Sequence, residues 1–175
     1  MEGILWQRMR EPFVYPVPPA PRTAVLVNWF RTNLLPAQAV RIFPRGWETD
    51  AAQFEPAAIA ATIDQFRKLS GVLIPSLTHA LIVLERPGSP RLTETDRTLF
   101  WRAFRVPVFE QIIGPFGQLL AFECEAHEGL HIEAPGLQLT EDMIESRPCP
   151  CGRETARFGV RGIAEVERRA AAYAR

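Results

Sequence analysis

The chain has 175 residues, of which 20 are basic and 20 acidic, so its formal net charge at neutral pH is zero. This balance creates no overall field that would attract nucleic acid or an anionic membrane, and we expect neither as a partner. Apolar residues make up 47% of the chain and charged residues 23%, a composition typical of a globular protein with a buried core. Three cysteines, an odd number, argue against a disulfide framework, so we expect a reducing compartment, most simply the cytoplasm.

Neither of two apolar stretches has the pattern of a targeting or membrane segment. The first residues, "MEGILWQRMREPF", are interrupted by Arg8, Arg10 and Glu11 before an apolar signal core can form. The most apolar run, "GVLIPSLTHALIVLE", is broken by Pro75 and His79 and is too short to cross a bilayer. The sequence therefore predicts a soluble protein.

The beginning of the chain is rich in proline. Residues 12–22, "PFVYPVPPAPR", contain five prolines, which fix the backbone torsion φ and remove amide donors. We expect an extended arm over residues 1–23, lying across a neighbouring surface, and one domain over residues 24–175. In that domain, residues 24–30 predict a strand and residues 39–47 a weaker one.

The middle of the chain predicts alternating helices and strands. Residues 56–69 are rich in alanine, begin with a proline and repeat apolar residues at helical spacing, so they predict an amphipathic helix. Residues 79–85, "HALIVLE", read as a buried strand. "LTETDRTLFWRAF" has a capping-box pattern in Thr93 and Asp96 and predicts a helix, which the strand "VPVFEQI" follows. The order strand, helix, strand is typical of a βαβ unit in an α/β or α+β fold with a small mixed sheet.

The second half of the chain places cysteine and histidine close together. Segments 119–126 and 130–134 predict a β-hairpin that contains Cys124 and His131. With "AHEG" as a four-residue loop, these two residues are directly opposite each other. Opposed residues of an antiparallel pair share one face, with β-carbons about 4.5–5.5 Å apart. A thiolate and an imidazole at that separation can bind one tetrahedral ion. Residues 162–175 predict a terminal helix.

The segment "RPCPCGR" supplies two further sulfur donors, Cys149 and Cys151. Its two prolines restrict the backbone, and the glycine lets the chain turn back beneath the sulfurs. Three thiolates and one neutral histidine around Zn²⁺ carry a net charge of about −1, which the flanking arginines offset. Because four protein ligands leave no position for water, we expect a structural zinc site, with a zinc-binding subregion over residues 119–160.

Two alternatives stay open for this cluster. Cysteine often packs as a small apolar residue, so the three thiols can also be read as ordinary core residues. His127 competes with His131 as the fourth ligand, and we favour His131 because His127 is expected at an exposed loop tip. The glutamates of the hairpin are expected on its solvated side: Glu123, Glu125, Glu128 and Glu133.

These motifs resemble the phenylacetate–CoA ligase branch of the adenylate-forming enzymes. The resemblance covers roughly residues 80–160 and depends on "LTETDRTLFWRAFRVPVFEQIIG", "AFECEAHEGLHIE" and "CPCGRETARF". Its specific part comprises Cys124, the Gly-Leu-His triplet that ends at His131, and the Cys-Pro-Cys-Gly-Arg segment 149–153. The resemblance implies the fold of such a ligase and supports the metal-site hypothesis.

The sequence departs from that family at the catalytic motifs. No Ser/Thr/Gly-rich phosphate loop precedes residue 80, and "IIGPFGQLL" stands where the family has a Tyr-Gly-x-Thr/Ser-Glu segment whose glutamate helps to hold magnesium. The interval in which the family has its ribose-binding aspartate is shortened to "APGLQLTEDMIESRP". We therefore do not expect this chain alone to adenylate a carboxylate.

Two functions follow as hypotheses. The first is a zinc-binding, non-catalytic accessory or interaction protein that contacts a protein partner or a second copy of itself. The alternative is part of a split or reduced acyl-activating enzyme that binds an acyl, CoA or nucleotide ligand. The missing phosphate loop and magnesium-holding glutamate favour the first.

Overall fold

The structure, a computed structural model, describes residues 21–29 and 39–159. Most of the predicted arm and the predicted helix over residues 162–175 lie outside the described residues. The described strands form one nine-stranded sheet in the order β2-β1-β3-β4-β5-β6-β7-β9-β8. The elements are β1 Thr23–Val25, β2 Val40–Ile42, α1 Thr49–Gln53, β3 Ala58–Ala61, α2 Ile63–Leu69, β4 Ala80–Glu85, α3 Glu94–Phe104, β5 Val108–Ile113, β6 Leu119–Glu123, β7 Leu130–Ile132, a 3-10 turn Glu141–Met143, β8 Ile144–Glu145 and β9 Arg157–Phe158.

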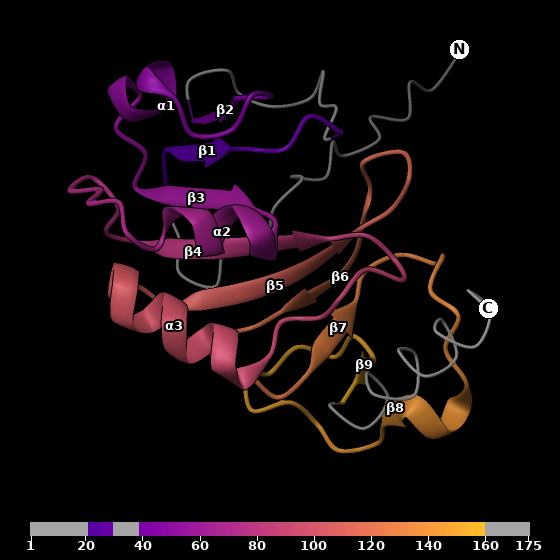
Figure 1. Cartoon of the computed structure of the whole chain (residues 1–175). Helices are drawn as coiled ribbons and strands as arrows, with labels where there is room; N and C mark the ends of the chain where they lie inside the picture. The colour runs from indigo at the N-terminus through magenta and orange to yellow at the C-terminus, as the bar shows by residue number, and fades with distance from the viewer. Residues whose placement is uncertain (1–20, 30–38, 160–175) are drawn as a thin grey trace, which may run out of the picture.

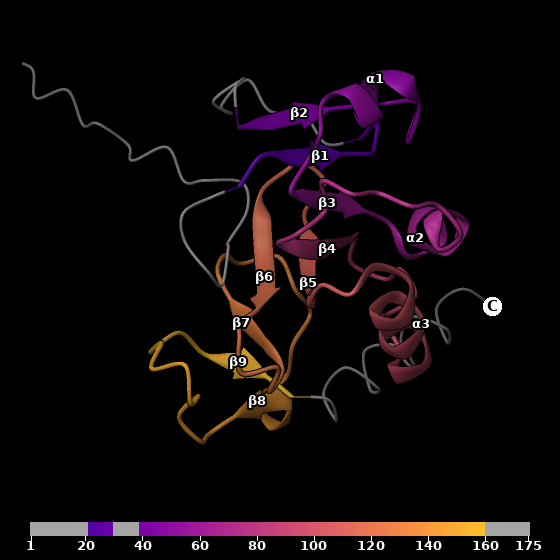
Figure 2. The same ribbon diagram turned by 90° about the vertical axis from the view of Figure 1, so that its left-hand side faces the viewer.

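The sheet has a parallel and an antiparallel half. Strands β2, β1, β3, β4 and β5 run parallel to one another, whereas β5, β6, β7, β9 and β8 pair antiparallel. The helices α2 and α3 connect neighbouring parallel strands and lie on the same face of the sheet (Figure 1, Figure 2). The predicted mixed α/β fold with a βαβ unit is therefore confirmed.

The parallel half has a core on both faces of the sheet. On the helix face, Phe66, Phe100 and Phe104 pack together, with ring centroids 5.6–6.4 Å apart. The opposite face carries a second cluster, which includes Val25, Ile82 and Leu84. Because β3 and β4 lie between other strands and beneath these clusters, every residue of both strands is buried.

The predicted helix over residues 56–69 is wrong in its first half. The stretch Ala58–Ala61 forms β3, and the helix α2 begins only at Ile63. Alanine favours a helix locally, but its small side chain also fits a strand that neighbours cover on both sides, so burial between β1 and β4 outweighs propensity. The true helix start is marked by a capping box between Thr62 and Gln65.

The start of α3 agrees with the predicted capping box. The Thr93 hydroxyl accepts from the Asp96 amide at 3.1 Å, and the Asp96 carboxylate accepts from the Thr93 amide at 3.3 Å. The carboxylate also forms an ion pair with Arg67, whose Nη2 lies 2.8 Å from Oδ1 of Asp96, and this pair connects α3 to α2. Burial alone would raise the pKa of Asp96, but the hydrogen bonds from Thr93 and Arg67 lower it overall.

We expect the substitution Asp96→Asn to lower the free energy of unfolding by about 1 kcal/mol at neutral pH. A carboxyl group whose pKa is lowered by folding stabilises the protein above its unfolded pKa, and this contribution disappears as the pH falls through the folded pKa. The difference between wild type and variant should therefore shrink in acid. Urea unfolding at a series of pH values checks this, and a difference that stays constant down to the acid limit would contradict it.

Candidate metal centre

Four donor side chains from three separate segments converge at the antiparallel end of the sheet. Cys124 directly follows β6, His131 is the middle residue of β7, and Cys149 and Cys151 occupy the turn between β8 and β9. Their ligand atoms all lie within 4.8 Å of one another. The structure thus brings together the four residues that the sequence singles out.

The hairpin has a different register from the predicted one. Phe122, not Cys124, pairs with His131. The strand β6 ends at Glu123, two residues earlier than predicted, and the loop covers residues 124–129, so the predicted direct opposition of Cys124 and His131 is wrong. Because side chains of a strand alternate with a period of two, a shift of two residues leaves Cys124 on the same face as Phe122 and therefore as His131.

The measured distances are close to those of a tetrahedral zinc site. With Zn–S near 2.3 Å and Zn–N near 2.1 Å, two sulfurs of a tetrahedron lie about 3.8 Å apart, and a sulfur and a nitrogen about 3.6 Å. The sulfurs of Cys124 and Cys149 are 3.6 Å apart. The sulfur of Cys151 lies 3.4 Å from Nε2 of His131. These two distances match a tetrahedral site, all four donors lie within 4.8 Å of one another, and sulfur and imidazole are donors that Zn²⁺ binds.

His131 is oriented for coordination through Nε2. Its Nδ1 lies 3.0 Å from the hydroxyl and 3.2 Å from the carbonyl oxygen of Thr155. A proton on Nδ1 that is donated to Thr155 leaves the lone pair on Nε2, the atom that faces the sulfurs. The ring also stacks on Phe122, with centroids 5.5 Å apart. Burial lowers the pKa of His131, which favours the neutral imidazole that a metal requires.

The thiols differ in their surroundings. Burial raises the pKa of Cys124 to about 12, so a proton stays on this sulfur unless a cation replaces it. Cys151 is only partly buried, and its pKa is lowered: burial opposes ionisation, but hydrogen bonds, the first of them from the Arg153 backbone, outweigh it. A divalent ion at the centre of the cluster offsets the charge of several thiolates held this close together.

Arginines surround the cluster. Arg153 pairs with Glu125 at 2.9 Å and lies over the ring of Phe122, and it contributes to the lowered pKa of Cys151. Arg157 is buried in β9 and donates to the backbone oxygens of Glu128 and Arg147. Sequence reasoning missed Thr155 and Arg157, because neither carries a motif and both reach the site only through the pairing of β7 with β9.

His127, the alternative fourth ligand, is not a member of the four-donor group. Its Nδ1 lies 2.8 Å from Oε1 of Glu123, and its ring stacks on Phe109. The expectation that Glu123 lies on the solvated side is wrong, since this residue is only 3% exposed. Glu125 and Glu128 are exposed as expected.

A close approach of two segments fixes the hairpin loop beside the cluster. Gly129 has a φ of +98°, and a β-carbon there would lie 2.5 Å from the carbonyl oxygen of Phe158. Both the backbone conformation and the lack of space demand glycine. This contact places β7 directly against β9 and so against the segment that holds Thr155.

We expect Gly129→Ala to destabilise the protein by several kcal/mol, because the added methyl meets the backbone of β9 and not a flexible side chain. Gly88→Ala is the matched control: φ is +83° there as well, but nothing lies within 4 Å of the added carbon, so only the strain of about 1–2 kcal/mol applies. Thermal unfolding of the two variants measures the difference. Equal losses of stability would show that the contact with β9 is unimportant.

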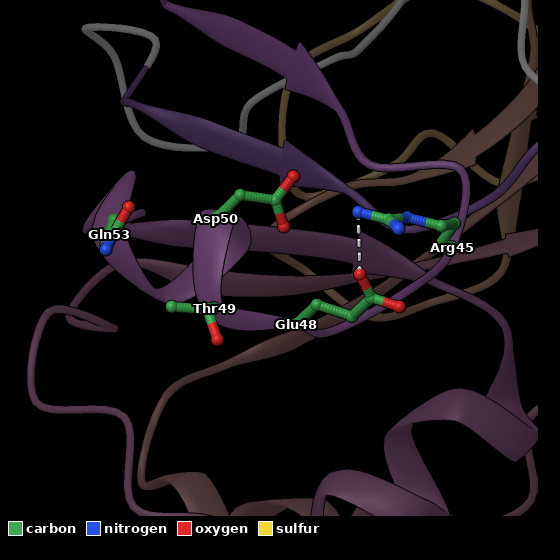
Figure 3. A pocket seen from close by; sticks show the side chains of 5 residues that line it. All are labelled: Arg45, Glu48, Thr49, Asp50 and Gln53. Carbon is green, nitrogen blue, oxygen red and sulfur yellow. Dashed lines mark ion pairs between the residues drawn. The ribbon is translucent and has the colours of Figure 1, made fainter.

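A shallow pocket elsewhere on the described surface carries no comparable chemistry. It lies at the start of α1 and is lined by Arg45, Glu48, Thr49, Asp50 and Gln53 (Figure 3). Arg45 and Glu48 form an ion pair at 2.9 Å, and both side chains are largely exposed. Among the described residues, none of the helices has the length and apolar character needed to cross a membrane.

Comparison with known proteins gives one kind of match. No protein-family model and no curated protein matches the chain. A solved structure of 2-hydroxyisobutyryl-CoA ligase, in an open conformation with 2-HIB-AMP and CoA, is similar in fold with a TM-score of 0.54 at 14% sequence identity. The match covers 83% of this chain and 45% of the ligase, so the chain spans less than half of that protein. The fold of this chain is thus similar to part of the fold of that ligase.

Proposed function

We propose that this chain is a zinc-binding, non-catalytic accessory or interaction protein built on part of an acyl-CoA ligase fold. The proposal is carried by the proximity of Cys124, His131, Cys149 and Cys151, whose ligand atoms lie within 4.8 Å of one another. The proposal also includes the resemblance of the surrounding motifs to the phenylacetate–CoA ligase branch. In this role the protein binds a protein partner or a second copy of itself.

The donor set supports a structural ion. Three sulfurs and one imidazole are the ligands that Zn²⁺ binds in closed tetrahedral sites, which leave no position for a reacting water. Three of the four residues are buried, and His131 is held by Thr155. When bound, the ion supplies the positive charge that stabilises the thiolates. The residues of the chain then join the β6–β7 hairpin to the segment between β8 and β9.

The metal is tested with two histidine variants. We expect the reduced wild-type protein to contain one zinc per chain by elemental analysis and native mass spectrometry. His131→Ala should lose most of the ion, because it removes a donor that lies 3.4 Å from the Cys151 sulfur. His127→Ala keeps all four donors, so it should still reach one ion per chain at saturating zinc, with any effect confined to affinity. A folded wild type without metal, or a His127→Ala variant that does not reach one ion per chain at saturating zinc while His131→Ala does, would refute the assignment.

The fold likeness favours a second candidate, part of a split or reduced acyl-activating enzyme. The chain matches 45% of a ligase whose structure contains an acyl-adenylate and CoA. The sequence lacks the phosphate loop and the magnesium-holding segment of the resembled family, which argues against adenylation by this chain alone.

We expect no pyrophosphate release from ATP with a panel of carboxylic acids, and no change in melting temperature with CoA. Native mass spectrometry of the same sample should show a homodimer or a co-purified protein. Pyrophosphate release that depends on an acid substrate, or a clear stabilisation by CoA, would favour the enzyme candidate instead.

A further inference from the structure

Glu123 is a buried carboxylate directly before the metal-cluster residue Cys124. Nη2 of Arg97 lies 2.8 and 2.9 Å from its two oxygens, the amide of Glu110 donates to Oε2 at 3.0 Å, and Nδ1 of His127 lies 2.8 Å from Oε1. These partners come from α3, β5 and the hairpin loop. The buried charge is thus paired and hydrogen-bonded from three sides.

Glu123 is also the last residue of β6, after which the chain leaves the sheet. The regular pairing between β5 and β6 includes Gln111 with Phe122. One residue further, the Glu110 amide donates to the side chain of Glu123 at 3.0 Å. The position of the chain directly before Cys124 therefore depends on this side chain and on the arginine that holds it.

The other end of the turn is held by His127. Its amide donates to the carbonyl oxygen of Cys124 at 3.1 Å, and its ring stacks on Phe109 with centroids 4.9 Å apart. The residue has a φ of +53°, which a non-glycine residue adopts only when its surroundings hold it there. The contacts of the ring with Glu123 and Phe109 provide that support.

We propose that Arg97, Glu123 and His127 act as positioning residues for the metal centre, holding Cys124 where its sulfur meets the other three donors. The inference depends on the proposed metal binding. None of the three belongs to the donor group, so they act on the affinity for the ion through the placement of Cys124. Since Arg97 belongs to α3, the support also connects the metal centre to the helix layer of the parallel half.

Arg97→Gln tests the support, and Arg67→Gln is the matched control. Each arginine forms an ion pair of 2.8 Å with a buried carboxylate. Arg97 of α3 pairs with Glu123 beside the donor group, whereas Arg67 of α2 pairs with Asp96 of α3. The probe is Co²⁺, titrated into the reduced full-length protein against a competing chelator. Its visible absorption bands and its thiolate charge-transfer band report the coordination geometry.

We expect Arg97→Gln to weaken Co²⁺ binding about tenfold, the lower end of the effect typical for residues that orient metal ligands, and to alter the bands. Arg67→Gln should keep the wild-type affinity and spectrum. Arg97→Lys keeps the charge but loses the guanidinium that donates to Glu123 through Nη2 and to the Val108 carbonyl oxygen through Nη1, so it should lie between wild type and Arg97→Gln. Glu123→Gln serves if Arg97→Gln does not fold. It leaves an amide oxygen for the Glu110 amide and no unpaired buried carboxylate, and it should weaken binding by a similar factor.

The outcomes separate this inference from the proposed function. A folded wild type that binds no Co²⁺ overturns the metal centre and the inference together. A wild type that binds Co²⁺, with Arg97→Gln or Glu123→Gln unchanged in affinity and spectrum, overturns the inference alone. Equal weakening by Arg97→Gln and Arg67→Gln also overturns it, because a general loss of stability would then explain both.

Discussion

Three sulfurs and one imidazole lie within 4.8 Å of one another at the antiparallel end of the sheet, and a shared cation is the constraint that we propose for this region. The segment between β7 and β9 contains only a 3-10 turn of three residues and the two-residue strand β8, so regular hydrogen bonding holds little of it. The apolar cluster around Leu120, Leu130 and Phe158 is smaller than the other two, and the cluster beneath the parallel strands extends to Phe122, Cys124 and Cys149. If the proposed ion is zinc, its binding adds about 10–16 kcal/mol to this apolar packing, as much as the whole stability of many domains.

The two halves of the sheet differ in what surrounds them. The parallel half buries β3 and β4 completely, and three phenylalanines of α2 and α3 pack together on its helix face. The antiparallel half uses hydrogen-bonded charges close to its donors, among them Arg153, Arg157 and Glu123. The buried carboxylate of Glu123 lies where the two halves join, and it accepts from Arg97 of α3 and from the Glu110 amide of β5.

The sequence predicted features that depend on neighbouring residues better than features that depend on distant ones. The capping box of Thr93 and Asp96 and the buried strand β4 were recognisable because their signals are local. The donor set was recognisable because cysteine and histidine are rare and here are clustered. Residues 58–61 were mistaken for a helix because only the neighbouring strands make alanine favourable in a sheet. The hairpin register was wrong by two residues because the loop length depends on Gly129 approaching Phe158, a contact between residues far apart in the chain. For the same reason no pattern indicated that Thr155 holds His131.

The likeness to an acyl-CoA ligase and the proposed structural metal are compatible, because a fold and the chemistry performed on it are separable. The match covers 83% of this chain, whereas adenylation in the resembled family needs a phosphate loop and a magnesium-holding carboxylate, and the sequence lacks both at the expected places. The antiparallel end of the sheet contains residues that contact one another: the four donors, Thr155 beside His131, and Glu123 before Cys124. These contacts position side chains, and the proposed accessory role uses the surface that they shape.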